Sequence, residues 1–378
     1  MLRIKPRPPL PSAAQTLPAP FYTDAALFAR EQEIFFRGMW MCVGRLDDLP
    51  TTGSFIVRSI ANDSIIIVRD TDSTVRAYYN VCRHRGTTLC TEPAGQLNGS
   101  IQCPYHAWTY DYDGELIGAP HMDNTEGFDK GNFPLRAVRA GVWDGFVWVN
   151  TSNDGPGLHE QLADLPEKFA PWDMGNLRRG ARLEYDIPAN WKLIFQNFSE
   201  CLHCPNLHPV LNKLSHYLSG ENEPLQPTYM GGRMDLSPGV ETMSMDGSRV
   251  CDYLPSLTSE LQRQVYYYAI FPNLLISAHP DYVMVHTLWP VAQDRTKLVC
   301  EFLFHPSSLE RLNAGTLELS GILEFWDMTN KQDWFVCELA QQGISSRGYT
   351  PGPYSNREEL LYAFDQFIVN RLNAAGEI

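Results

Sequence analysis

The chain has 378 residues, which allows two domains or one domain with a large insertion. Its composition, with 44% hydrophobic and 20% charged residues, is typical of a soluble globular protein. A formal net charge of -14 argues against nucleic acid as a partner, because phosphates attract Lys and Arg. Apolar runs are short, as at 64–68, so we expect no membrane span. Nine scattered cysteines do not suggest a disulfide framework, and an intracellular, cytoplasmic protein is expected.

The first half of the chain is predicted to be an arm, a helix and a β-rich domain. Residues 1–20 contain six prolines and favour an extended arm, and residues 24–40 have the apolar spacing of a helix. The segment 41–155 contains short runs rich in β-forming residues, at 54–60, 64–69, 74–82 and 145–152. Asn98-Gly99 and Asp113-Gly114 are hairpin signals within it. Residues 153–157, NDGPG, are predicted to be a linker.

The second half, 156–378, has a mixed α and β pattern. A helix is predicted to begin after Asn190, a good N-cap, and to run through Cys204 until Pro205 ends or kinks it. Strands are expected at 264–271, 274–279, 282–289 and 297–304. A long amphipathic helix is expected from about Leu319 to Gln342, with Gly343 as its C′ residue. The chain is therefore assigned to the α+β class.

Two short segments combine Cys and His in the manner of a metal site. Cys82 and His84 form Cys-x-His, and Cys103 and His106 form Cys-x-x-His. Two thiolates and two imidazoles suit a [2Fe–2S] cluster with both Cys on one iron and both His on the other. Zinc is the alternative, because the same ligands bind it tetrahedrally. Each segment contributes one Cys and one His, whereas zinc fingers pair Cys with Cys and His with His. We therefore favour the iron–sulfur cluster over zinc.

A second metal motif lies in NFSECLHCPNLHP. Glu200 and His203 are three residues apart and are expected to share a helix face, and His208 follows Pro205, where the chain can turn back. Two His and a carboxylate form the facial triad of non-haem Fe(II) oxygenases. Zinc hydrolases use similar sets, so this motif alone leaves a zinc enzyme open. Cys201 and Cys204 could indicate redox or zinc chemistry, but we favour an ordinary structural role.

The two motifs together resemble those of Rieske non-haem iron oxygenases, in the catalytic alpha subunit of the ring-hydroxylating family. The resemblance implies that Glu200 bridges the two metal centres and that a distant Asp completes the mononuclear iron site. Asp333 matches the family pattern in QDWFVCELAQQG and shares an apolar helix face with Trp326 and Cys337, whereas Asp327 falls on a polar face. Two alternatives stay open: Asp333 as a buried acid paired with an Arg, and Glu200 as a direct iron ligand.

The resemblance also implies an architecture and a set of partners. Residues 1–40 would pack as an arm and helix on the catalytic domain, 41–155 would be the Rieske domain, and 156–378 the mononuclear iron domain, with an antiparallel sheet flanked by helices. A head-to-tail homotrimer is expected, in which the cluster of one subunit serves the iron of its neighbour. The chain has no G-x-G-x-x-G fingerprint, so electrons should come from a separate NAD(P)H reductase, with or without a ferredoxin. A pure electron carrier is the rival class, but it would not need the second metal motif.

The substrate is predicted from a narrower resemblance. NVCRHRG, CPYHAWTYDYDG and NWKLIFQNFSECLHC resemble the branch with choline, carnitine and glycine betaine oxygenases. We therefore expect hydroxylation or oxidative demethylation of a quaternary ammonium compound such as a betaine, held by aromatic rings. The alternative is a hydroxylase, dioxygenase or O-demethylase of an aromatic acid or aryl ether. A carboxylate substrate would need an Arg in the pocket, which the sequence does not place there.

Two further side chains are candidates for the cavity. Gln196 lies one turn before Glu200 and either points toward the iron or is an ordinary helix amide. His286 shares a strand face with Met284 and Leu288, and we favour a core role over a pocket-lining one. The aromatic residues expected to supply a cavity or core are Tyr266, Tyr267, Tyr268, Phe271, Tyr282 and Trp289.

Overall fold

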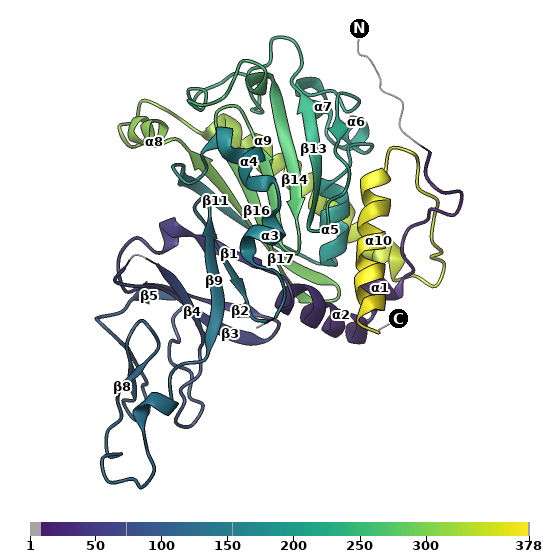
Figure 1. Cartoon of the computed structure of the whole chain (residues 1–378). Helices are drawn as coiled ribbons and strands as arrows, with labels where there is room; N and C mark the ends of the chain where they lie inside the picture. Colours follow the sequence, from purple (N-terminus) through teal and green to yellow (C-terminus); the bar gives the residue numbers. More distant parts are fainter. Residues whose placement is uncertain (1–8, 73, 153, 377–378) are drawn as a thin grey trace. The chain divides into compact units, whose positions relative to one another are not determined.

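The computed structural model describes residues 9–72, 74–152 and 154–376. The chain forms two compact units, one made of Met1–Ile34 with Leu162–Ile378 and the other of Phe35–Gln161 (Figure 1). We call them the C-terminal unit and the N-terminal unit. Within the described residues, no helix combines the length and the apolar character that crossing a membrane requires.

The N-terminal unit is built from antiparallel β-sheets. A seven-stranded sheet has the order β1-β10-β9-β4-β3-β2-β5, and a three-stranded sheet has the order β6-β7-β8. The strands are β1 Met41–Arg45, β2 Ser54–Ile60, β3 Asp63–Arg69, β4 Val75–Tyr79, β5 Ala94–Gln96, β6 Ile101–Gln102, β7 Thr109–Tyr110, β8 Leu116–Gly118, β9 Ala137–Trp143 and β10 Phe146–Asn150. Short helical segments accompany them: η1 Gln32–Arg37, η2 Leu46–Asp48, η3 Lys130–Asn132 and α3 Leu158–Leu162.

Most of the local predictions for this unit are confirmed. The expected strands correspond to β2, β3, β4 and β10. The hairpin at Asp113-Gly114 joins β7 to β8, which pair. The hairpin at Asn98-Gly99 is wrong: Gly99 has a positive φ of 81°, but β5 pairs with β2 and β6 pairs with β7. Asn98-Gly99 determines only the local turn, whereas packing within the sheets determines which strand pairs with β5 and which with β6.

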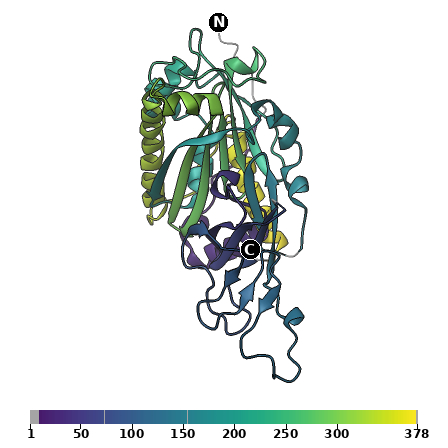
Figure 2. The same cartoon turned by 90° about the vertical axis from the view of Figure 1, so that its left-hand side faces the viewer.

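The C-terminal unit places helices around one antiparallel sheet, which confirms the α+β class. The sheet order is β11-β17-β16-β15-β14-β13-β12. The strands are β11 Arg178–Ile187, β12 Glu221–Asn222, β13 Tyr229–Asp235, β14 Gln264–Ile270, β15 Leu274–Ala278, β16 Val283–Ala292 and β17 Arg295–Phe304. The helices are α1 Pro20–Thr23, α2 Ala25–Glu31, α4 Leu165–Phe169, η4 Ala170–Trp172, α5 Trp191–Phe198, α6 Cys204–Leu207, α7 Pro209–Leu214, η5 Leu261–Arg263, α8 Pro306–Asn313, α9 Ser320–Ile344 and α10 Glu359–Ala374. Figure 2 shows α9 lying along one face of the sheet.

The four predicted strands of this unit are confirmed as β14 to β17, but the helix ends differ from the expectations. Asn190 caps α5 by accepting a hydrogen bond from the backbone of Lys192 at 2.9 Å. The helix ends at Phe198 rather than at Cys204, because Ser199 leaves helical geometry and its hydroxyl donates to the carbonyl of Phe195 at 2.6 Å. The long helix α9 continues through Gly343 to Ile344 instead of ending before it.

The predicted helix over residues 24–40 is two segments. The α-helix α2 begins after Asp24, whose carboxylate accepts from the backbone of Ala26 and Leu27, and it passes at Gln32 into the π-helical η1. A π-helical turn is wider than an α-helical one, so the apolar spacing of the sequence still lies on one side although the hydrogen-bond pattern changes.

A buried ion pair fixes α5 to the N-terminal part of the C-terminal unit. Lys192 Nζ lies 2.5 Å from Glu31 Oε1, and both side chains are at most 1% exposed. The indole nitrogen of Trp191 donates to the other Glu31 oxygen at 2.8 Å. Burial lowers the pKa of Lys192, and Glu31 opposes that shift. Because removing one partner leaves a buried charge unpaired, this pair holds the start of α5 in place.

Replacing Glu31 with Gln should therefore destabilise the C-terminal unit by about 3–5 kcal/mol. The exposed pair of Lys331 and Asp327 on α9, 2.6 Å apart, provides the control, and Lys331→Ala should cost less than about 1 kcal/mol. Denaturant unfolding followed by circular dichroism measures both changes. Equal, small effects of the two substitutions would contradict the importance of the buried pair.

Candidate metal centres

The two Cys-His segments of the N-terminal unit fold into loops of the same form. In each loop the Cys carbonyl accepts a hydrogen bond from the amide four residues later: Gly86 to Cys82 at 3.0 Å, and Ala107 to Cys103 at 3.1 Å. Both donors have a positive φ, 74° for Gly86 and 56° for Ala107. The left-handed residue turns each chain back past its own Cys. His84 and His106 lie within these turns.

The thiols and the imidazoles of the loops form two separate pairs. Cys82 and Cys103 are each 3% exposed, whereas His84 is exposed and its ring lies 4.7 Å from that of His106. The His84 ring also stacks on Trp108 at 4.7 Å, and the Tyr110 hydroxyl lies 3.4 Å from the Cys82 sulfur. Burial raises the pKa of the Cys82 thiol.

This pairing fits a two-iron cluster better than a zinc ion. A cluster takes the two thiolates on one iron and the two imidazoles on the other, whereas zinc needs all four donors to converge. Among the described residues, only one group of three or more possible ligands has all its donor atoms within 4.8 Å of one another, and it lies in the C-terminal unit. The donors of the two loops thus suit the [2Fe–2S] group that the sequence predicts.

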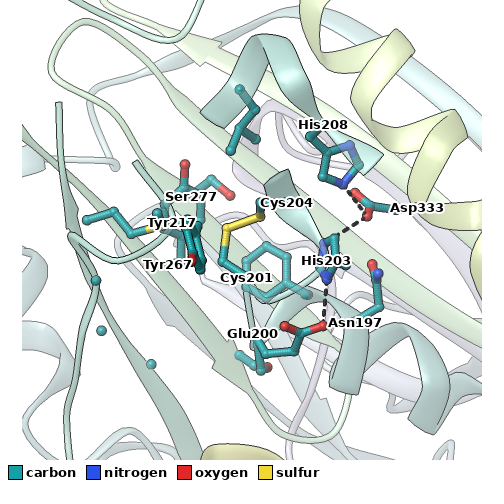
Figure 3. A pocket seen from close by; sticks show the side chains of 18 of the residues that line it. Asn197, Glu200, Cys201, His203, Cys204, His208, Tyr217, Tyr267, Ser277 and Asp333 are labelled. Carbon is teal, nitrogen blue, oxygen red and sulfur yellow. Dashed lines mark hydrogen bonds and ion pairs between the residues drawn. A yellow bond between two sulfur atoms is a disulfide. The ribbon is translucent and has the colours of Figure 1, made fainter. Parts of the chain in front are cut away.

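The group in the C-terminal unit consists of His203, His208 and Asp333, which we call the metal trio. His208 Nε2 lies 2.8 Å from Asp333 Oδ1, and His203 Nε2 lies 3.4 Å from the same oxygen. Figure 3 shows the three side chains pointing toward one another. Two imidazole nitrogens and one carboxylate on one side of a site form the donor set that Fe(II) takes in oxygenases, and the opposite side stays open to small molecules.

Three separate elements bring the metal trio together. His203 directly precedes α6, His208 lies between α6 and α7, and Asp333 lies on α9. Glu200 and His203 do not share a helix face as predicted, because α5 has already ended and both lie in the irregular segment before α6. They meet nonetheless, with Glu200 Oε1 2.5 Å from His203 Nδ1.

Each imidazole of the metal trio is held from behind by a side-chain oxygen. Glu200 binds Nδ1 of His203, and Gln332 Oε1 lies 2.7 Å from Nδ1 of His208. These contacts direct both Nε2 atoms toward Asp333. Burial favours neutral His203, but Asp333 and Glu200 together raise its pKa to about 10. Burial likewise opposes ionisation of Asp333, yet the two imidazoles hold its pKa below the usual range.

The arrangement separates the roles of the candidate acids. Asp333 faces both Nε2 atoms, whereas Glu200 lies on the other nitrogen of His203 and also accepts a hydrogen bond from the backbone of Leu202. Direct ligation by Glu200 in place of Asp333 is therefore disfavoured. Asp327 lies elsewhere, with the Tyr185 hydroxyl donating to it at 3.0 Å and Lys331 beside it.

The metal trio opens into a pocket of about 140 Å³ over the sheet. The strand register places Gly232, Tyr267, Ser277 and Met284 side by side in one row from β13 to β16. This row, which we call the pocket floor, lies below a wall that includes Phe198 from α5 and residues of α9. Gly232 is required at its end, because a Cβ there would lie 2.2 Å from the backbone oxygen of Glu221 in β12.

Several candidates from the sequence occupy positions other than those favoured. Cys201 and Cys204 are not free structural thiols: they form a disulfide with 5.0 Å between their Cα atoms, and both line the pocket (Figure 3). His286 is buried yet lines the pocket, and burial lowers its pKa to about 4. Gln196 points away from the pocket, donating to Asp365 at 2.7 Å. Of the six aromatic residues proposed for a cavity, only Tyr267 lines it.

Sequence reasoning missed three polar residues of the site. Gln332 was not considered, although its position beside Asp333 could have suggested it. Arg233 and Arg357 line the pocket from β13 and from the segment before α10. No local pattern marks them, because the packing of α10 against β13 brings the segment before α10 next to the strand that carries Arg233.

Removing the carboxylate of the metal trio should abolish binding of the single metal ion. Asp333→Ala is expected to lose mononuclear iron while the visible absorption of the cluster is retained, because the two sites share no ligand. Iron and sulfide analysis of anaerobically purified protein measures this. Asp327→Asn on the same helix is the matched control and should keep both metals; loss of the cluster in Asp333→Ala would refute the assignment.

Comparison with known proteins agrees with both centres. The family model for the ring hydroxylating alpha subunit (catalytic domain) matches residues 174–374, and that for the Rieske [2Fe-2S] domain matches residues 39–131. The glycine betaine monooxygenase oxygenase subunit of Chromohalobacter salexigens is 32% identical over 91% of this chain and 82% of its own length. The carnitine monooxygenase oxygenase subunit of Escherichia coli is 30% identical over 90% and 87%. A solved quaternary ammonium Rieske monooxygenase superposes with a TM-score of 0.79 at 26% identity, covering 96% of this chain and 99% of the other.

Proposed function

Because this chain belongs to the ring-hydroxylating oxygenase alpha-subunit family and carries a Rieske [2Fe–2S] domain, we propose that it oxidises a small quaternary ammonium compound such as a betaine. The family makes it an oxidoreductase that incorporates oxygen, with a [2Fe–2S] cluster and non-haem iron as cofactors. The observation that carries the proposal is the metal trio opening into a pocket with aromatic walls, in a chain similar over most of its length to betaine and carnitine oxygenases.

We assign the ligands from the geometry of the two centres. Cys82 and Cys103 would hold one iron of the cluster, and His84 and His106 the other. His203, His208 and Asp333 would hold the mononuclear iron. When bound, the cluster would supply single electrons and the mononuclear iron would supply the oxidising chemistry.

The protein's own contribution is orientation and the exclusion of water. Phe198, Tyr267 and Trp334 present aromatic surface to the pocket, and such surface attracts a quaternary ammonium without a hydrogen bond. His286 is neutral near pH 7, so it does not repel a cation. A methyl group held beside the metal trio would be hydroxylated with one atom of dioxygen, while two electrons from the reductase and two protons convert the other atom to water. The hydroxymethyl group on nitrogen then loses its hydroxyl proton and leaves as formaldehyde, which gives the demethylated amine.

Oxygen-dependent demethylation of betaines tests this proposal directly. With a surrogate reductase and NADH, the holoenzyme should consume oxygen and release formaldehyde with glycine betaine or carnitine. Aromatic acids and aryl ethers form the second arm of the same screen, because hydroxylation, dioxygenation or O-demethylation of such compounds is the alternative function. Turnover confined to the aromatic arm would contradict the quaternary ammonium proposal and leave the oxygenase assignment intact.

The working assembly is proposed to be a head-to-tail homotrimer that receives electrons from a separate reductase, with or without a ferredoxin. Two exposed apolar side chains are close in sequence to candidate ligands: Tyr105 directly precedes His106 and is 57% exposed, and Phe335 follows Asp333 by two residues on α9 and is 56% exposed. Leu339, one turn after Phe335 on α9, is 47% exposed. Contact between subunits would bury such surface. Sedimentation velocity determines the number of subunits, and a monomer would contradict the assembly.

Three further assignments belong to the proposal. Residues 1–40 would act as an arm and helix on the catalytic domain, 41–155 as the Rieske domain and 156–378 as the catalytic domain. The match of the Rieske model to residues 39–131 supports the second of these.

A cytoplasmic location is also proposed, because the reductase needs NAD(P)H. Fractionation of cells followed by immunoblotting checks this location.

Glu200 is proposed to couple the two centres between neighbouring subunits. Its Oε1 lies 2.5 Å from Nδ1 of His203, its second oxygen accepts from the backbone of Leu202, and the side chain is 15% exposed. Glu200→Gln should keep both metals but slow re-oxidation of the cluster by oxygen and substrate about 10- to 100-fold, as loss of such a supporting contact does. Stopped-flow absorbance measures the rate. Glu324→Gln, an exposed acid on α9, is the control, and an unchanged rate in Glu200→Gln would remove the bridging role.

A further inference from the structure

Arg357 is a cation in the pocket without an acidic partner. The other arginine that lines the pocket, Arg233, pairs with Glu221 at 2.8 Å. Across the described ranges, Arg357 forms no ion pair, and its guanidinium makes no hydrogen bond. The acids that follow it are engaged: Glu358 accepts from the backbone of Ser355 at 2.7 Å, and Glu359 from Asn222 at 2.9 Å. A half-buried guanidinium facing a cavity favours an anionic ligand there.

Arg357 and the metal trio line the same pocket from different elements. The pocket floor runs from β13 to β16 through paired residues. At the β16 end, His286 lies under Trp334 of α9, with ring centroids 5.9 Å apart, next to Asp333. At the β13 end, α10 packs on β13, and the bond from Asn222 to Glu359 ties β12 to the start of α10. Arg357 directly precedes that start, so it enters the pocket from the β13 side, whereas Asp333 enters it from α9.

The residues that line the pocket also include hydrogen-bond donors that have no partner among the described residues. The Tyr267 hydroxyl, the Ser277 hydroxyl and the Trp334 indole nitrogen are buried, and none has a hydrogen-bond partner in the part of the chain that the structure describes. Burial raises the pKa of Tyr267, so its hydroxyl keeps its proton and can donate. Figure 3 shows Tyr267 and Ser277 on the side of the Cys201–Cys204 disulfide away from Asp333. Unpaired buried donors favour a ligand that accepts.

We propose that Arg357 binds the carboxylate of the substrate and thereby selects zwitterionic betaines over cations that lack an acid group. A guanidinium pairs with a carboxylate through two parallel hydrogen bonds, which a neutral hydroxyl cannot form. The methylated nitrogen then lies among the aromatic rings, with a methyl group toward the metal trio. This inference rests on the proposed function for the ammonium part of the substrate, whereas the carboxylate contact also serves an aromatic acid.

Steady-state kinetics of the reconstituted holoenzyme tests the role of Arg357. In Arg357→Ala, KM for glycine betaine should rise at least about tenfold, which corresponds to about 1.4 kcal/mol, with little change in kcat. KM for choline, which has no carboxylate, should stay the same, and Arg357→Lys should recover part of the loss. Arg347→Ala is the matched control, since Arg347 is exposed in the same connection between α9 and α10 and does not line the pocket.

Binding without turnover separates failure of this inference from failure of the proposed function. Equilibrium dialysis with radiolabelled glycine betaine and radiolabelled benzoate should show one of them bound by the wild type and lost in Arg357→Ala. Binding of benzoate alone, lost in Arg357→Ala, supports the carboxylate contact and overturns the betaine proposal. Three results would overturn the role of Arg357. They are equal binding of the carboxylates by wild type and Arg357→Ala, an equal rise in KM for choline, and no binding of either carboxylate.

Discussion

The contact between His208 and Asp333 is the constraint on which the C-terminal unit depends. Their Nε2 and Oδ1 atoms lie 2.8 Å apart across 125 residues of sequence. The contact joins the segment between α6 and α7 to α9. A carboxylate on the inner face of a helix is costly unless it is compensated, and two imidazoles with Nε2 directed inward, or a cation that they share, supply the compensation. The packing of α9 and the assembly of the metal site therefore depend on each other.

Support for this contact comes from oxygen atoms behind each ring. Glu200 and Gln332 fix His203 and His208 from their Nδ1 sides, so both rings present the same nitrogen to Asp333. The position of Glu200 depends in turn on α5, whose first turn is held by the buried contact between Lys192 and Glu31. A chain of contacts thus connects the N-terminal helix to the metal trio within one unit.

The pocket combines charged and metal-binding groups with aromatic surface. The metal trio and Arg357 line it from different elements, and Phe198, Tyr267 and Trp334 contribute aromatic surface. Such a cavity orients an elongated molecule with unlike ends, because only one direction places an anion at the guanidinium. Orientation decides which carbon lies over the iron, and the side chains far from the metal thus influence which bond is oxidised.

The sequence by itself determined the metal chemistry, the β-rich and mixed character of the two halves, and most of the strands. Those features depend on neighbours in the chain: Cys82 and His84 need only their own loop, and alternating β-branched residues form strands wherever they pair. Tertiary structure alone decided the early end of α5, the disulfide of Cys201 and Cys204, and the arrival of Arg357 in the pocket. Arg357 depends on the packing of segments distant in sequence, and the other two depend on the path of the chain after α5, which the residue types alone do not fix.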